Sequence, residues 1–343
     1  MAKITDKGRN YRKVIIILSI ILVAGIIVSF TLGRYPVTIK ELLSVLLSKI
    51  KFLNIEQFWE NRVELIIFNV RFPRIIISCL VGCCLAAAGA SYQGVFQNPM
   101  ASPDILGASS AAGFGAALAI ILELPSSMVT LFAFAASLVC VLLVIFVSER
   151  AKGKKVIGLI LAGIMISSLF SAATSYLKLV ADPNSQLPEI TYWLMGSFNG
   201  AEKSDVAFAI IPMVIGLVPL LILRWRINIL TMGDDEARTM GVNAKAVRLV
   251  VILASTLITA ASVAVSGVIG WVGLVVPHLA RRLVGNNFKY LMPATMLFGA
   301  IFMLIVDNLC RNVTTTEIPI GIVTAFVGAP FFVYLLTREG ERI

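Results

Sequence analysis

The densest set of reactive side chains in the sequence lies in one short stretch, Thr231–Val242. Its four charged residues fall within five positions: Asp234, Asp235, Glu236 and Arg238. Such side chains can form ion pairs with a partner protein, or they can be solvated on a connector. At a bilayer centre each charge would cost roughly 2.5–3.5 kcal/mol, and the four together would cost on the order of 10 kcal/mol. The stretch is therefore expected outside the hydrocarbon.

The same stretch predicts a short helix. Asp234 and Asp235 are residue types that cap and favour a helix N-terminus. Gly241 is suited to end that helix in a left-handed conformation. Asn243 is placed to cap a second helix, which runs into the next apolar segment.

The remaining reactive groups do not assemble into a catalytic or metal site. His278 is the only histidine, and no cysteine is near it in the sequence, so a zinc site would lack ligands. Cys79 and Cys83 share a helix face, which suits either a soft metal or, far more commonly, close packing between helices. The sequence contains no nucleotide-binding Gly-x-x-x-x-Gly-Lys-Ser/Thr motif and no hydrolase motif. We therefore expect no catalytic residue, metal or cofactor in this chain.

Composition indicates the fold class. The chain has 343 residues, of which 58% are hydrophobic and 14% charged, whereas soluble domains carry about 25% charged residues. This favours an all-α polytopic membrane protein surrounded by membrane lipid. The net charge of +10 comes without a nucleic-acid-binding motif, so no nucleic-acid partner is expected.

Ten apolar segments are predicted to cross the bilayer. They are Val14–Phe30, Ile75–Val95, Leu106–Leu122, Met128–Val147, Val156–Leu177, Val206–Leu223, Val247–Val265, Ser266–Leu283, Tyr290–Asp307 and Pro319–Leu336. Together they predict one transmembrane domain over residues 14–337, with short tails at 1–13 and 338–343 and a connector at 226–246 between spans six and seven.

The distribution of basic residues predicts the orientation. With both termini in the cytoplasm, 19 of the 29 Lys and Arg residues lie on the cytoplasmic side, as the positive-inside rule requires. The charged connector then faces the cytoplasm. Because buried acidic or histidine residues are nearly absent from the spans, the chain lacks the ion route of a self-sufficient secondary transporter, which is the less favoured alternative. The driving force is expected to come from a partner.

Five motifs together resemble one family of membrane permeases. They are Arg71–Arg74 (Arg-Phe-Pro-Arg), Asn98–Gly107, Gly233–Gly241, Ser266–His278 and Pro319–Pro330. The chain is similar along its length to the FecCD-type permeases of ATP-binding-cassette (ABC) importers for iron–siderophore complexes, haem and cobalamin. The resemblance implies a ten-span bacterial cell-membrane protein that pairs with a second copy or a paralogue. It also implies two ATPase subunits, which bind the ATP and magnesium, and an extracytoplasmic binding protein, either periplasmic or lipid-anchored.

The resemblance assigns the charged connector to energy coupling. In the family this connector forms two short coupling helices that fit a cleft on the ATPase. The matching residues are Gly233, Asp234, Asp235, Glu236, Ala237, Arg238 and Gly241.

The resemblance also assigns arginines to the docking of the binding protein. The matching positions are Arg71, Arg74 and Arg311, whose planar guanidinium groups pair well with carboxylates. Two alternatives remain open. In the first, Arg71 and Arg74 are interfacial anchors; in the second, Arg311 pairs with Asp307 one helical turn away.

A cytoplasmic gate is implied at two places. Asn98 and Met100 match its first part, and Asn98 has a helix-end turn as its alternative role. Val156 and Ile157 match the second part, where the cobalamin permease has small hydroxyl residues, so closure here would rely on dewetting. The preferred cargo is a ferric siderophore, with haem and cobalamin as alternatives, by analogy with the family.

Overall fold

The structure, a computed structural model, describes residues 11–49, 57–150 and 155–339. Most of the predicted N-terminal tail and part of the predicted C-terminal tail lie outside the described residues, as do residues 151–154 before the fifth predicted span. The helices are α1 (Tyr11–Thr31), α2 (Ile39–Ser48), α3 (Asn61–Leu65), the π-helix η1 (Ile66–Arg71), α4 (Phe72–Val95), the 3-10 helix η2 (Pro103–Leu106), α5 (Ala108–Ile121), α6 (Ser126–Arg150), α7 (Lys155–Val180), α8 (Gln186–Met195), α9 (Lys203–Leu230), α10 (Asp234–Thr239), α11 (Ala244–Ser266), α12 (Val272–Val284), α13 (Phe288–Asn312) and α14 (Ile320–Glu339).

The described residues confirm an all-helical protein with many membrane-compatible helices. Seven of the described helical segments are long and apolar enough to cross a membrane, and α5 and α14 are shorter apolar helices. With α12, these segments correspond one to one with the ten predicted spans. The number of actual crossings remains a prediction.

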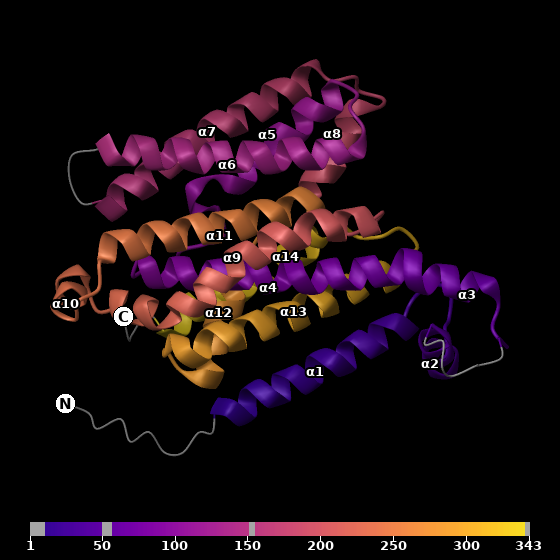
Figure 1. Cartoon of the computed structure of the whole chain (residues 1–343). Coiled ribbons are helices and arrows are strands. Elements are labelled where there is room, and N and C mark those ends of the chain that lie inside the picture. Colours follow the sequence, from indigo (N-terminus) through magenta and orange to yellow (C-terminus); the bar gives the residue numbers. More distant parts are fainter. Residues whose placement is uncertain (1–10, 50–56, 151–154, 340–343) are drawn as a thin grey trace.

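Three helices form the centre of the bundle. Most of α4, α11 and α13 is buried, whereas few residues of α1, α7 and α9 are buried and many of their apolar side chains are exposed. Exposed apolar side chains on the outer helices are expected for a bundle whose surface contacts lipid rather than water. Figure 1 shows α5, α6 and α7 together on one side of this centre and α1 on the other.

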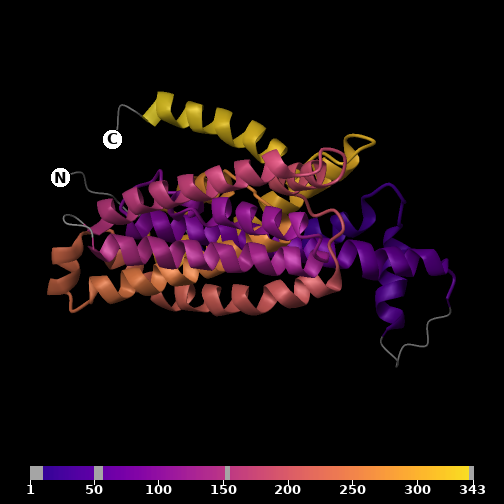
Figure 2. The same cartoon turned by 90° about the horizontal axis from the view of Figure 1, so that it is seen from above.

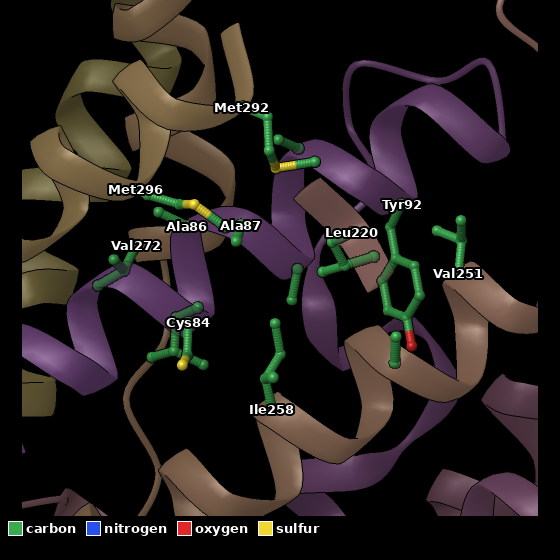
Figure 3. Packing of buried hydrophobic residues seen from close by; sticks show 14 of the residues in the cluster. Cys84, Ala86, Ala87, Tyr92, Leu220, Val251, Ile258, Val272, Met292 and Met296 are labelled. Atoms are coloured by element: carbon green, nitrogen blue, oxygen red, sulfur yellow. The ribbon is translucent and has the colours of Figure 1, made fainter. Parts of the chain in front are cut away.

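Small residues allow the central helices to approach closely. Gly82 of α4 lies directly against Gly299 of α13, and Gly89 of α4 lies against Gly273 of α12. Such glycine contacts bring backbones together where the lipid environment gives little hydrophobic driving force between helices. Figure 3 shows the adjoining side chains, among them Tyr92, which shares a hydrogen bond of 3.0 Å with Thr256 of α11.

The second span differs from its prediction. The predicted helix begins at Ile75, after an external Arg-Phe-Pro-Arg segment, but the observed helical segment runs from Asn61 to Val95. Pro73 would normally end a helix, because it lacks an N–H group and clashes with the preceding turn. Here the π-helical turn η1 precedes it, and the Phe72 N–H donates to the carbonyl of Ile67 five residues earlier. The longer helix therefore places both arginines of the motif inside it.

Other boundaries also change. The eighth predicted segment begins at Ser266, but α11 extends to that residue and α12 starts only at Val272. The helix α9 continues to Leu230, which shortens the predicted connector of 226–246 to residues 231–243. The start of α1 and the end of α14 lie at the same end of the bundle as α10 (Figures 1 and 2).

Candidate functional site

The connector between α9 and α11, residues 231–243, folds back on itself around the short helix α10, and we call it the hook. Gly233 precedes α10 with a positive φ of 130°, which a residue with a side chain rarely adopts, and α10 then runs from Asp234 to Thr239. Ala237 is buried on the inner side of α10. Gly241, with φ at 75°, ends the turn in the predicted left-handed conformation. The side chain of Asn243 accepts a hydrogen bond of 3.1 Å from the Ala246 N–H, so its predicted cap of the next helix is confirmed.

An ion pair holds this hook against the bundle. Arg248, buried in the second turn of α11, donates to both carboxylate oxygens of Asp234, at 2.6 and 3.2 Å. Asp234 is therefore a brace within the chain, and it is not the helix N-cap, which is Gly233. The exposed side chains left for a partner include Asp235, Glu236 and Arg238.

The connector between α9 and α11 has one short helix, α10, where the family resemblance implied two coupling helices. The second helix that Asn243 caps is α11 itself, which continues without a break from Ala244 to Ser266. Movement of the hook would thus be passed directly to a central helix.

The first predicted gate is a tight turn after α4. Asn98 accepts a hydrogen bond of 2.9 Å from the Met100 N–H, so its side chain does form a helix-end turn, and Met100 is exposed. Gln97 donates to the carbonyl of Leu230, at 2.7 Å, at the end of α9. The turn is therefore tied to the helix that leads into the coupling hook. In the second gate position, Ile157 is exposed and Val156 is partly buried in the first turn of α7.

The same turn leads into a partly buried carboxylate, that of Asp104. Asp104 in η2 accepts a hydrogen bond from the Ser109 hydroxyl. Burial raises the pKa of the Asp104 carboxyl above its usual value, and the hydrogen bond from Ser109 opposes that rise.

The three predicted docking arginines form one buried cluster at the other end of the bundle. Their exposed fractions are 3% for Arg71, 6% for Arg74 and 7% for Arg311. Arg74 pairs with Asp307 of α13 at 2.8 Å and with both carboxylate oxygens of Glu317 at 3.0 Å. It thereby joins α4 to α13 and to the loop before α14.

The other two arginines are held by backbone carbonyls. Arg71 donates to the carbonyls of Phe30 and Tyr35, which fixes the chain after α1. Arg311 donates to the carbonyl of Ser29 at 2.8 Å, and its Nε lies 3.9 Å from Asp307. The pairing of Arg311 with Asp307, held open above, is therefore present. A binding protein would reach these groups only if the cluster opened, and docking remains a prediction.

The sequence alone did not identify Arg248, which holds the hook, or Glu317, which belongs to the arginine cluster. Arg248 lies inside the predicted seventh span, and a charge at such a position signals a nearby counter-charge, which proved to be Asp234. Glu317 lies between the last two predicted spans, two residues before Pro319, and nothing near it in the sequence signals a buried arginine partner. In the part of the chain that the structure describes, no cluster of three or more His, Cys, Asp or Glu side chains could hold a metal ion.

The outward faces of α7 and α14 are not covered by any other element of the described chain. On α7, Ser168, Ser171 and Ser175 lie exposed in a row with Leu161 and Leu169. On α14, Phe326 is among the most exposed apolar side chains, and a cavity of about 660 Å³ separates this helix from α8 and the 267–271 loop. Figure 2 shows α14, in yellow, diverging from the rest of the bundle.

A bundle of long apolar helices, whose outer helices expose apolar side chains, defines a polytopic membrane protein. The chain belongs to the FecCD transport family, whose model matches residues 21–338. It is therefore a permease subunit of an ABC importer of the metal-chelate type.

Relatives of known name agree with this assignment but differ in cargo. The chain is 39% identical over 338 residues to the molybdate import system permease protein of Haemophilus influenzae, covering 96% of this chain and 98% of the relative. It is 37% identical over 350 residues to the Fe(3+)-citrate import system permease protein of Bacillus subtilis, covering 100% of both. A solved metal-chelate type ABC transporter in an inward-facing conformation matches with a TM-score of 0.85 and 37% identity, over 95% of this chain and 99% of that one.

Proposed function

We propose that this chain is the ten-span permease of a bacterial cell-membrane importer for a ferric siderophore. The observation that carries the proposal is membership of the FecCD family together with similarity along the whole length to a ferric-citrate permease. Similarity along the whole chain supports the proposal that the cargo is a metal complex, because the entire transport fold is shared and not only one motif.

The transport path is proposed to lie between two copies of this chain or between this chain and a paralogue. The uncovered faces of α7 and α14 support this, because one copy alone leaves a row of hydroxyls on α7 facing lipid. A second copy placed there would turn these serines toward a shared path lined by small, hydroxyl and apolar groups. Between Lys155 and Lys178, which lie near the two ends of α7, the chelate would meet no fixed charge on this helix.

Energy is proposed to enter through the hook at α10. When two partner ATPase subunits bind ATP and close, Asp235, Glu236 and Arg238 would follow their movement. Because Asp234 is clamped to Arg248, displacement of α10 would pull on α11. The link from Gln97 to Leu230 would carry the same displacement to the Asn98–Met100 turn, which lies at the proposed gate.

The coupling role is tested by replacing Asp235, Glu236 and Arg238 with serine while keeping Asp234. We expect the ATPase either to detach or to hydrolyse ATP without uptake, whereas the fold is retained. A serine at Asp182, in the exposed turn after α7, is the matched control and should leave uptake unchanged. Uptake at the wild-type rate by the triple variant would remove the coupling role.

The cargo is tested with the complete importer in proteoliposomes. Uptake driven by ATP would be measured for ferric siderophores, ferric citrate, haem, cobalamin and molybdate, each radiolabelled and delivered by the cognate binding protein. We expect a ferric siderophore to be accumulated. Molybdate is the second candidate, because the molybdate permease relative is 39% identical over 338 residues. Accumulation of molybdate but no iron complex would overturn the siderophore proposal and leave the permease assignment intact.

A further inference from the structure

The short helix α2 carries an apolar ridge that nothing in the described chain covers. The ridge consists of Ile39, Leu43, Leu46 and Leu47, whose exposed fractions range from 39 to 59%. At 100° per residue these four side chains occupy one side of the helix. Four apolar side chains on one face of a ten-residue helix need an apolar environment.

The other faces of α2 are already used, so the ridge is fixed in place. Leu42 and Val45 are buried in a cluster with Phe30 of α1 and with Val63 and Ile67 of the second span. Thr38 and Glu41 form a reciprocal capping box at the start of the helix. Two hydrogen bonds from Thr38 lower the pKa of the Glu41 carboxyl, the larger effect coming from the Thr38 N–H and the smaller from its hydroxyl. The carboxyl of this cap is therefore charged at neutral pH. The ridge cannot rotate inward without breaking these contacts.

The depth of α2 follows from the length of α1. A helix of 21 residues rises about 31 Å at about 1.5 Å per residue, which matches a hydrocarbon thickness of about 30 Å. Phe30 ends this span, and Leu42 and Val45 pack in the same cluster as Phe30. The level of α2 along the bundle is therefore the boundary between hydrocarbon and headgroups.

The direction of α2 agrees with that depth. In Figure 1 α2 is seen nearly end-on, and in Figure 2 it extends sideways, across the direction of the spanning helices. Its ridge thus runs along the membrane surface. The exposed Leu32 at the end of α1 extends the lipid-facing surface of that span towards it. Lys40 lies over the exposed ring of Phe58 at 5.0 Å and can reach lipid phosphates from the polar side.

We propose that α2 is an interfacial helix whose ridge inserts into the outer leaflet of the lipid bilayer, anchoring the external end of the permease. The partner is the lipid surface itself. The apolar side chains enter the acyl boundary, as amphipathic helices do to a depth of about 5–10 Å, and Lys40 stays among the headgroups. The inference rests on the membrane location of the family and is independent of the cargo.

The test uses an environment-sensitive fluorophore on the full-length chain in nanodiscs of phosphatidylethanolamine and phosphatidylglycerol. The label is attached to Leu43→Cys, with Leu46→Cys as a second ridge position and Ser44→Cys as the control on the polar side. Unsubstituted protein gives the labelling background of the five native cysteines. Lipids carrying a nitroxide either near the headgroup or near the chain end, and aqueous iodide, serve as quenchers.

The ridge labels should emit at shorter wavelength than the Ser44 label. Nitroxide near the headgroup should quench them more than nitroxide near the chain end, and iodide should quench mainly the control. Quenching of both ridge labels by iodide alone would overturn the proposal. Ridge labels that become shielded only after the extracytoplasmic binding protein is added would show a protein-docking surface, and this too would overturn it.

Discussion

Replacement of Asp307 by asparagine tests whether the arginine cluster is a structural clamp. Asp307 is fully buried, and it is the acidic partner of both Arg74 and Arg311. Asparagine has nearly the same volume, so the change removes the charge without opening a cavity. Arg74 would keep its bond to Glu317, but Arg311 would keep only its hydrogen bonds to Ser29 and Asn308.

The magnitude follows from the burial of the partners. Removing one member of a buried ion pair typically costs about 3–5 kcal/mol, because the charge that remains is left without compensation. We expect about 3 kcal/mol for Asp307→Asn, since Glu317 still neutralises Arg74 and Asp307 Oδ2 accepts no hydrogen bond in the wild-type protein. Glu317→Gln should cost about 1 kcal/mol or less, because the Glu317 side chain is 21% exposed and water can replace part of the interaction.

The assay is reversible unfolding in mixed micelles by titration with dodecyl sulfate, followed by circular dichroism. Unfolding free energies are compared for wild type, Asp307→Asn, Glu317→Gln and the double variant Asp307→Asn/Arg311→Gln. The double variant should recover part of the loss, because the uncompensated charge of Arg311 is also removed. If Asp307→Asn were no more destabilising than Glu317→Gln, the clamp would be refuted.

Three further substitutions test the packing and the coupling hook in the same unfolding assay. Gly89→Ala should destabilise the protein by at least the usual overpacking cost of about 1–3 kcal/mol, because the added methyl group would overlap the carbonyl of the facing Gly273. Gly270→Ala should be neutral, because no atom lies close to the position of the added methyl group. Gly241→Ala should cost about 1–2 kcal/mol through its left-handed backbone alone, and Gly241→Asn should cost less. Asn243→Ala should cost about 1 kcal/mol by removing the cap of α11, with Asn243→Asp as the tolerated control. If any of the three destabilising variants unfolded at the same dodecyl sulfate midpoint as wild type, the stabilising role proposed for the corresponding residue would be refuted.

The helical class and most element positions could be predicted because the signals are local. Apolar runs set the spans, and Gly241 and Asn243 set the hook through backbone conformation and capping. The amphipathic stretch Ile190–Met195 is too short to span a bilayer, and it forms the end of α8. Each of these inferences needs only neighbours in sequence.

Features that depend on distant partners could not be predicted. The burial of Arg71 and Arg74 within a helix could not be predicted, because Pro73 normally interrupts a helix and nothing in the sequence signals a π-helical turn ahead of it. The clamp partner Glu317 is 243 residues away from Arg74. Asp234 looked like a solvent-facing cap until the structure placed the buried Arg248 beside it.

The contacts of α4 indicate which part of the bundle stays rigid during transport. At its outer end Arg74 binds α13 and the loop before α14, and at its inner end Gln93 accepts a hydrogen bond of 2.5 Å from Arg281 of α12. Between these ends, glycine contacts join α4 to both α12 and α13 along their backbones. Closely packed backbones and buried polar ties leave little freedom for sliding, so these three helices should move as one body. Few residues of α1, α7, α9 and α14 are buried, and among these four helices α7 and α14 are the two whose uncovered faces would line the path. Alternating access would then require only that the hook at α10 tilt the rigid body relative to α7 and α14, with no rearrangement of the central packing.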